Sequence, residues 1–207
     1  MSPVAVTADL ILASASPRRR ELLERRGLGL IVRPAGDACE DARAAGWQTL
    51  PVPEQARRLA LLKALAVARE LGPLTVPLLA ADTLVAHAGA RLGKPRDRGE
   101  ARAMLRGLLG SPHEVITGFT LVFPGTGRVL TGLVTTEVRL VDADPGGLID
   151  DYVEAGLADG KAGAYGIQDP LFAPLVRSVR GSFDNVVGLP VAEVMAALDE
   201  RREEERP

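Results

Sequence analysis

The chain has 207 residues, 46 % of them hydrophobic, and its 25 Lys and Arg stand against 27 Asp and Glu. This length and composition are typical of a globular protein with a sizeable core and exclude a disordered chain. The formal net charge of −2 offers no broad attraction to nucleic acid. Because Cys39 is the only cysteine, an intramolecular disulfide and a cysteine-built zinc site are excluded.

The sequence carries no membrane signal. Its longest apolar candidate, residues 76–86, is interrupted by Asp82, far short of the roughly 20 apolar residues that a membrane helix needs. The first apolar stretch, residues 10–13, precedes the arginines at 18–20, which is the reverse of the order in a signal peptide. We therefore expect a cytoplasmic protein that binds neither a membrane nor nucleic acid.

Strand and helix signals alternate along the first half of the chain. Ser16 and Pro17 follow the apolar run 10–13 and are typical of an N-cap and a first helical position, so a strand leads into a helix that ends before Gly27. The further elements predicted here are a strand at 30–33, a long loop at 34–53, a helix at 53–71, a buried strand at 76–81 and a helix at 97–109.

The second half is predicted to be richer in β-structure. Two β-rich runs, 114–123 and 128–141, are joined by Pro-Gly-Thr-Gly, a hairpin signal. The remaining predictions are helices near 147–155 and 190–202, a glycine-rich loop at 160–166 and a strand at 175–179. Since no repeat or low-complexity linker divides the chain, we expect one α/β domain over residues 1–207, with a mixed twisted sheet and flanking helices.

The turn at residues 14–19, Ser-Ala-Ser-Pro-Arg-Arg, is the first candidate site. A helix that begins at Pro17 leaves backbone N–H groups free at its N-terminus, and Ser14, Arg18 and Arg19 lie beside them. These donors, together with the helix dipole, favour a bound anion. The alternative is that Ser16 only caps the helix and the arginines are solvated.

Asp82 is the second candidate, because it follows a run of buried apolar residues. Sites of α/β proteins lie at the carboxyl ends of strands, and burial raises a carboxyl pKa toward the range of a general base. The alternative is a turn aspartate that bonds its own backbone. Glu40 and Asp41, in the long loop, could hold Mg²⁺ together with Asp82, although acidic loop residues are most often only solvated.

Only three of the 25 basic residues are lysines, which makes each lysine worth locating. Lys63 lies on an apolar helix, where it either points at an anion or extends outward to solvent. Lys94 lies beside a rigid turn that is not a Walker loop. Lys161 lies in the glycine-rich loop, and Gln168 after it could read an amide-like edge of a base.

Together these motifs resemble the Maf family of nucleoside triphosphate pyrophosphatases, over about residues 10–198. They comprise Ser-x-Ser-Pro-Arg-Arg, a loop glutamate, a helix lysine, Ala-Asp-Thr, Gly-Lys-Pro-Arg-Asp, Lys-Ala-Gly-Ala-Tyr-Gly-Ile-Gln and Val-Gly-Leu-Pro. The resemblance implies an α/β fold of two lobes around a deep cleft, similar to the inosine triphosphate pyrophosphatases, and a homodimer. It also implies hydrolysis of a nucleoside triphosphate between its α- and β-phosphates.

The resemblance gives the catalytic and metal roles to carboxylates. Asp82 matches the catalytic aspartate, described as the proton acceptor, and also a metal-binding position. The family often has an Asp-Glu pair in the loop after the second strand, whereas this chain reads Asp-Ala-Cys-Glu-Asp at 37–41. Glu40 is the metal-binding match if one residue is inserted. The implied cofactor is a divalent cation, Mg²⁺ or Mn²⁺.

The resemblance gives the substrate-binding roles to basic and polar residues. Three positions match those that determine base specificity: Arg18, Thr83 and Gln168. The phosphate-facing lysines match Lys63, Lys94 and Lys161. The anion-binding turn contributes Ser14 and Arg19.

A branch of the family acts on 7-methylguanosine triphosphate and typically has Trp, Gln and Glu where this chain has Arg18, Thr83 and Gln168. Gln168 can donate and accept together, which suits uracil or thymine, and Arg18 would repel a cationic purine. The expected substrates are dTTP and UTP, with CTP and modified uridine triphosphates as further ones, in the house-cleaning of nucleotide pools. The alternatives are the 7-methyl-GTP branch and a regulator of cell division that acts through a protein partner.

Overall fold

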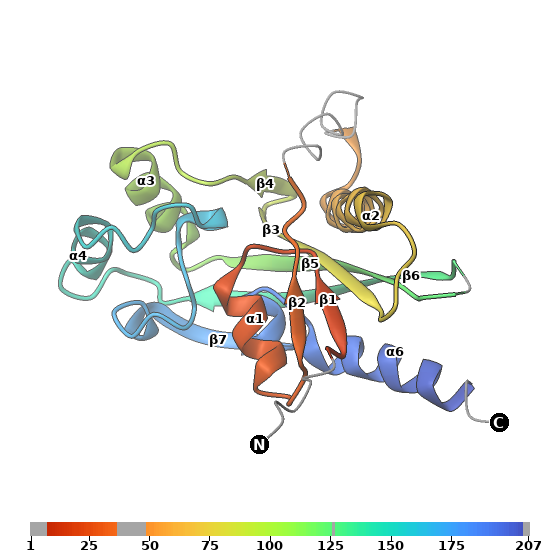
Figure 1. Ribbon diagram of the computed structural model, residues 1–207. Coiled ribbons are helices and arrows are strands. Elements are labelled where there is room, and N and C mark those ends of the chain that lie inside the picture. Colours follow the sequence, from red (N-terminus) through yellow and green to blue (C-terminus); the bar gives the residue numbers. More distant parts are fainter. Residues whose placement is uncertain (1–7, 37–48, 126, 205–207) are drawn as a thin grey trace, which may run out of the picture. The chain divides into compact units, whose positions relative to one another are not determined.

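The computed structural model describes residues 8–36, 49–125 and 127–204 (Figure 1). Glu40 and Asp41 lie outside the described residues. Within this part of the chain, seven strands form one mixed sheet in the order β2-β1-β3-β5-β6-β7, with β4 paired to β3, and helices flank the sheet. The predicted α/β class is therefore confirmed.

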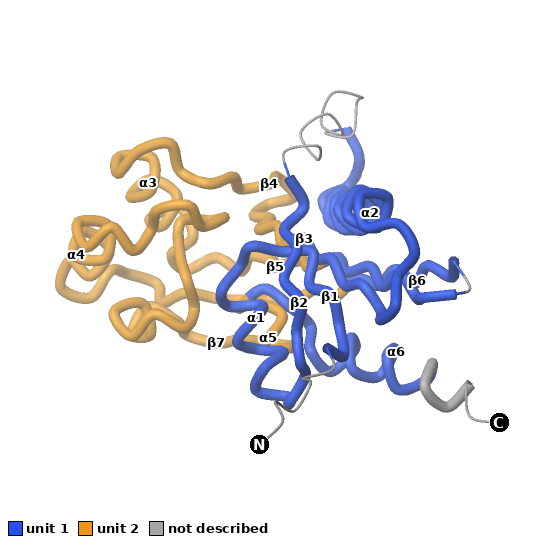
Figure 2. The backbone as a smooth tube through the Cα atoms, in the orientation of Figure 1, with its two compact units in different colours: residues 1–82, 118–133, 188–207 blue, residues 83–117, 134–187 orange. Residues whose placement is uncertain are grey.

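The chain divides into two compact units, which Figure 2 colours separately. Unit 1 contains residues 1–82, 118–133 and 188–207, and unit 2 contains residues 83–117 and 134–187. The chain passes from one unit to the other four times. Three of these passages lie within strands, β3 (Leu78–His87), β5 (Pro112–Val122) and β6 (Val129–Leu140), and the fourth follows Val187. Asp82 is thus the last residue of a unit 1 segment, and Thr83 is the first residue of unit 2.

Unit 1 contains the parallel part of the sheet. Its own elements are β1 (Leu10–Leu12), α1 (Pro17–Glu24), β2 (Leu30–Val32), α2 (Val52–Leu71) and α6 (Val191–Glu204). β1 pairs in parallel with β2 on one side and with β3 on the other, and all three of its residues are buried. This burial on both faces explains the continuous apolar run from which the strand was predicted.

Helix α2 packs closely on β5 because small residues line the contact. Ala56, Ala60 and Ala64 recur every four residues along the helix and are fully buried. Opposite them, a Cβ added at Gly118 of β5 would lie 2.4 Å from the carbonyl oxygen of Ala56. Glycine is thus required at this position by the approach of the helix backbone. The same packing fixes the helix turn that carries Lys63.

Unit 2 contains the antiparallel part of the sheet. Its own elements are β4 (Ala90–Leu92), α3 (Arg98–Leu108), α4 (Leu148–Glu154), β7 (Val176–Arg180), α5 (Phe183–Val187) and two 3₁₀ turns at Ala162–Ala164 and Ala173–Leu175. β4 pairs with β3 and β7 with β6, both antiparallel.

An aromatic cluster occupies the core of unit 2. The rings of Tyr165 and Phe172 stack with centroids 4.6 Å apart, and Tyr152 tilts against Phe172 at 5.1 Å. On the other side of Tyr165, the His113 ring meets it edge-on, and His113 Nε2 lies 2.7 Å from the Tyr165 hydroxyl. The cluster therefore joins α4, the glycine-rich loop and β5.

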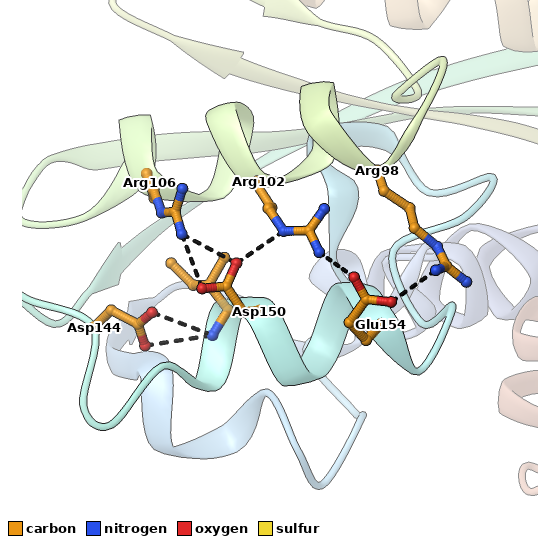
Figure 3. Close-up of polar contacts among 7 residues, drawn as sticks. Arg98, Arg102, Arg106, Asp144, Asp150 and Glu154 are labelled. Carbon is orange, nitrogen blue, oxygen red and sulfur yellow. Dashed lines mark hydrogen bonds and ion pairs between the residues drawn. The ribbon is translucent and has the colours of Figure 1, made fainter.

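Helices α3 and α4 are joined by a ladder of ion pairs (Figure 3). Arg98 binds Glu154 at 2.7 Å, and Arg106 binds Asp150 at 3.0 Å. Between them, Arg102 contacts both carboxylates. A helix of seven residues such as α4 is too short to be stable alone. The ladder and the buried Tyr152 together attach it to the rest of unit 2.

Most predicted elements are confirmed within a few residues, but one strand boundary was wrong. β3 extends from Leu78 to His87, so Asp82 and Thr83 lie inside the strand and do not follow it. The strand continues because Leu84, Val85 and Ala86 are buried after the two polar residues. The short elements β4 and α5 were not predicted. No helix in the described ranges is long and apolar enough to span a membrane.

Candidate active site

Asp82 forms the centre of a charged cluster in unit 1. Ala80 and Ala81 before it are fully buried, whereas its own side chain is 15 % exposed. Lys63 of α2 reaches the strand and donates to Asp82 Oδ1. Lys63 therefore points at an anion, and that anion is the carboxylate of Asp82. Because the carboxylate is paired but still partly open, a further polar ligand can approach it.

The predicted anion-binding turn contains a partly buried arginine, Arg19, whose direction is fixed by its hydrogen bonds. Ser16 caps α1 by accepting from the backbone N–H of Arg19 at 3.4 Å. The Arg19 guanidinium donates to Ser14 Oγ at 3.1 Å and to the carbonyl oxygen of Gly188 at 2.8 Å. Ser14 Oγ also accepts from the backbone N–H of Ser16 at 3.2 Å. The predicted capping role of Ser16 is thus confirmed.

The electrostatics of Arg19 connect this turn with Asp82. Burial lowers the pKa of the Arg19 guanidinium, the Asp82 carboxylate raises it, and Arg18 lowers it again. Unit 1 therefore brings together a carboxylate, an ammonium and a guanidinium from β3, α2 and α1. Arg18 is half-buried on the same helix turn as Arg19.

Thr83, which is partly buried, begins a chain of hydrogen bonds that leads to buried residues of unit 2. Its Oγ1 lies 2.9 Å from Oγ1 of Thr117 on β5, and Thr117 Oγ1 lies 3.3 Å from the backbone carbonyl oxygen of Asn185. Sequence reasoning missed Thr117 and Asn185. For Asn185 a signal existed, because it lies two residues before the start of the Val-Gly-Leu-Pro motif at Val187. For Thr117 no local pattern distinguishes it from other strand threonines.

Lys161 is held by a carboxylate within unit 2. Its ammonium donates to Asp169 Oδ2 at 2.5 Å, and the Tyr152 hydroxyl donates to the same oxygen at 2.5 Å. The backbone N–H of Gly166 in turn donates to the Tyr152 oxygen at 2.9 Å. These bonds fold the glycine-rich loop onto α4. The predicted contact of Lys161 with a phosphate stays a prediction.

Lys94 and Gln168 are both exposed in unit 2. The backbone N–H of Gly163 donates to the carbonyl oxygen of Gly93 at 3.0 Å, so the segment that carries Lys94 is bonded to the glycine-rich loop that leads to Gln168. Their roles toward phosphate and base stay predictions, as does the metal role of Glu40.

Two carboxylates, Asp82 and Glu40, are predicted to bind a metal ion. Of these two, Asp82 lies among the described residues. No group of three His, Cys, Asp or Glu able to hold a metal occurs among them. Mg²⁺ usually binds one or two carboxylates and completes its coordination with water and substrate phosphates. The hard oxygen of the partly open Asp82 therefore fits a cation that is shared with a bound phosphate.

The chain matches the family described as Maf-like protein over residues 9–201. A dTTP/UTP pyrophosphatase of Anaeromyxobacter dehalogenans (strain 2CP-C) is 47 % identical over 194 residues, which cover 91 % of this chain and 92 % of that protein.

Two further relatives carry the same name. That of Salinibacter ruber is 41 % identical over 204 residues, covering 96 % of this chain and 94 % of the relative. That of Chlorobium luteolum is 40 % identical over 195 residues, covering 93 % and 96 %. Since the family match and these identities extend over nearly the whole chain, from the Ser-x-Ser-Pro-Arg-Arg turn to α6, this protein belongs to the Maf-like protein family.

Proposed function

We propose that the protein is a nucleoside triphosphate pyrophosphatase that hydrolyses dTTP and UTP to the monophosphate and pyrophosphate. The observation that carries the proposal is the Asp82–Lys63 pair beside the partly buried Arg19, a carboxylate flanked by two cations. The activity named for relatives at 40–47 % identity supports the same reaction. Hydrolysis of an anionic substrate requires a proton acceptor and positive charge at one place, and unit 1 provides both.

In the reaction, a water oxygen forms a bond to the α-phosphorus, and the bond from that phosphorus to the α–β bridging oxygen breaks. Asp82 accepts the proton of the attacking water, and pyrophosphate leaves. Lys63 orients the Asp82 carboxylate through its hydrogen bond and balances charge near the phosphates. Arg19 lies in the N-terminal turn of α1, and its guanidinium is held by Ser14 and the Gly188 carbonyl. The positive charge of Arg19 and the free backbone N–H groups of this turn bind a phosphate.

A divalent cation, Mg²⁺ or Mn²⁺, would be held by Asp82 and the phosphates, with Glu40 as a further ligand, and would neutralise charge on the triphosphate. Lys94 and Lys161 are the remaining phosphate-facing candidates. Arg18, Thr83 and Gln168 read the base, with CTP and modified uridine triphosphates as further substrates.

The test is a panel of dTTP, UTP, CTP, GTP, ATP and 7-methyl-GTP with Mg²⁺, followed by measurement of released pyrophosphate. We expect dTTP and UTP to have the highest kcat/KM. Release of phosphate in place of pyrophosphate, or no turnover of any triphosphate, would contradict the proposal. Equal rates on 7-methyl-GTP and dTTP would retain the reaction but reject the base assignment.

The role of Asp82 has its own test. The substitution Asp82→Asn keeps the size of the side chain and removes the proton acceptor, so we expect a loss of about 10²-fold or more in kcat. Asp151→Asn is the matched control, because Asp151 is an exposed carboxylate on α4. Near-normal turnover by a folded Asp82→Asn protein would move the proton acceptor to another residue.

We further propose that the enzyme works as a homodimer in the cytoplasm, where it removes unwanted triphosphates from the nucleotide pool. Sedimentation equilibrium of the full chain tests the dimer, and a single species with the mass of one chain would reject it.

A further inference from the structure

Three segments of unit 2 that the proposed function assigns to the substrate meet at one glycine. β3 carries Thr83, the segment after β4 carries Lys94, and the glycine-rich loop leads to Gln168. Gly163, in the middle of that loop, is buried and lies against both of the other segments. The position of this residue therefore affects the distances among all three substrate-binding side chains.

The first contact of Gly163 is a hydrogen bond to the segment that carries Lys94. The backbone N–H of Gly163 donates to the carbonyl oxygen of Gly93 at 3.0 Å. That carbonyl belongs to the peptide group between Gly93 and Lys94, so the bond fixes the main chain directly before the lysine. Because Gly163 is buried, an opened bond would leave an unpaired N–H group in the interior, which is unfavourable. The bond therefore favours one placement of the Lys94 backbone relative to the loop.

The second contact of Gly163 is with the side chain of Val85 on β3. A Cβ added at Gly163 would lie 3.1 Å from Val85 Cγ1 and 3.3 Å from Cγ2. Val85 is 3 % exposed, and its branched side chain has few alternative rotamers, so it does not move aside easily. Val85 lies two residues after Thr83 and thus on the same face of the strand. A residue larger than glycine at position 163 would therefore displace the loop from the strand that carries Thr83.

The left-handed backbone of Gly163 does not by itself explain why this residue is glycine. Gly163 has a φ of 68°, but the next residue, Ala164, has a φ of 63° and is fully buried. The loop thus already holds an alanine in this conformation. What distinguishes position 163 is the lack of room for a Cβ against Val85. The close approach of the loop to the strand, in addition to the turn, requires glycine here.

The other end of the loop is fixed independently. The backbone N–H of Gly166 donates to the Tyr152 hydroxyl at 2.9 Å, and a Cβ added at Gly166 would lie 2.7 Å from Asp169 Oδ2. Gln168 lies directly before Asp169, whose carboxylate accepts from the same tyrosine. The Gln168 side chain therefore extends from a fixed backbone, and its spacing from the other two segments depends on the contacts of Gly163.

We propose that Gly163 is a positioning residue that holds Lys94, Thr83 and Gln168 at the spacing that one bound nucleoside triphosphate requires. This inference rests on the proposed function, which assigns Lys94 to the phosphates and the other two side chains to the base. A nucleoside triphosphate must reach both kinds of side chain at once, so a shift of the loop weakens its binding. A ligand that has phosphates but no base can follow Lys94 when that segment moves.

The experiment compares KM and kcat for UTP in the wild type, Gly163→Ala and Gly146→Ala. In Gly163→Ala the added methyl group displaces the loop from Val85. We expect KM to rise about tenfold, the equivalent of one hydrogen bond. We expect kcat to change by less than about threefold, because the substitution leaves the proton acceptor of unit 1 unaltered. Gly146→Ala is the matched control and should keep the wild-type KM, because Gly146 has a φ of 72° in the same unit but an added Cβ there meets open space among the described residues.

A second substitution separates the contact with Val85 from the backbone strain of the new alanine. Val85→Ala removes both Cγ atoms and leaves the Cβ of residue 85 at 3.4 Å from the added methyl group, which is an ordinary contact. Introducing Gly163→Ala into the Val85→Ala protein should therefore raise KM much less than introducing it into the wild type. An equal rise in both backgrounds overturns the inference.

Tripolyphosphate, which has no base, distinguishes positioning from a damaged phosphate site. Its Ki as a competitive inhibitor should differ by less than about threefold between the wild type and Gly163→Ala, while KM for UTP rises. A Ki that rises as much as KM overturns the inference, and so does a folded Gly163→Ala protein with the wild-type KM. Failure of the wild type to release pyrophosphate from UTP and dTTP rejects the proposed function instead.

If Gly163→Ala does not fold, amide hydrogen exchange of the wild type replaces it. Tripolyphosphate and α,β-methylene-UTP, an analogue that resists hydrolysis between those phosphates, are each added at the same multiple of their Kd, so that both stabilise the fold equally. Binding and opening of the Gly163 contacts are reciprocally linked, so the analogue should slow exchange of the Gly163 N–H about tenfold more than tripolyphosphate does. Equal exchange rates with the two ligands overturn the inference.

Discussion

Protonation of His113 should destabilise the protein as the pH falls. His113 is 1 % exposed, and burial, with a smaller contribution from His87, lowers its pKa from 6.5 to about 4. The folded state therefore keeps the imidazole neutral, while the unfolded chain binds a proton below pH 6.5. The stability that the neutral imidazole confers is fully present above that value and is lost as the pH falls toward 4.

The size of the effect follows from the two pKa values. With 6.5 in the unfolded chain and about 4 in the folded protein, the free energy of unfolding should decrease by about 2 kcal/mol between pH 7.5 and pH 5 through this one group. Other groups also titrate in this interval, so the quantity to measure is the difference between wild type and a variant that lacks the imidazole. His113→Gln retains an amide that can bond Tyr165.

The assay is urea unfolding of both proteins at pH 7.5 and pH 5, analysed by linear extrapolation. We expect the stability difference between wild type and His113→Gln to shift by about 2 kcal/mol in favour of the variant at pH 5. Tyr165→Phe removes the hydroxyl 2.7 Å from Nε2 but leaves the ring buried. Because burial is the first cause of the shift, that variant should keep the wild-type pH dependence. A difference between wild type and His113→Gln that is the same at both pH values would refute the reasoning.

Three further predictions concern packing and charge. Gly118→Ala should destabilise unit 1 by about 3 kcal/mol or more, because the added Cβ would lie 2.4 Å from the Ala56 carbonyl oxygen. A urea unfolding curve that matches that of the wild type would contradict this prediction. Asp169→Asn should lower the free energy of unfolding by about 1–3 kcal/mol, because the ammonium of Lys161, whose side chain is 17 % exposed, loses its carboxylate partner. A double-mutant cycle with Lys161→Met should show positive coupling, and additive effects of the two substitutions would exclude the pairing. Arg102→Gln, in the centre of the ladder of Figure 3, should lower Tm slightly, and the decrease should become smaller at 1 M NaCl; a decrease that does not depend on salt would indicate lost packing.

Local chemistry made the helices predictable. Pro17 and Gly27 bracket α1, and Asp97 caps α3 by accepting from the backbone N–H of Glu100 at 2.8 Å. Each of these signals acts within four residues, so a pattern in the sequence is enough to detect it. Helix α5 was not predicted because its five residues are too few to show a periodic pattern.

The partners of the polar site residues depend on the fold and could not be predicted. Arg19 donates to the carbonyl oxygen of Gly188, which is 169 residues away in the sequence. The extension of β3 through Asp82 is tolerated because Lys63 pairs with that carboxylate and Thr117 with the next side chain. From the sequence, a charged residue after an apolar run resembled the end of a strand.

The segment from Asn185 to Gly188 supports both units through its main chain. The carbonyl of Asn185 accepts from Thr117 in unit 2, and the carbonyl of Gly188 accepts from Arg19 in unit 1. Substituting side chains cannot delete a carbonyl group, so an alanine scan over Val186 and Val187 would report on packing and leave both acceptors present. The vulnerable position is Gly188, whose φ of 135° lies where L-residues are strained. Any bulkier residue at position 188 would change the orientation of the adjoining peptide planes. Because the carbonyl at this position accepts from Arg19, that change would disturb the anion-binding turn.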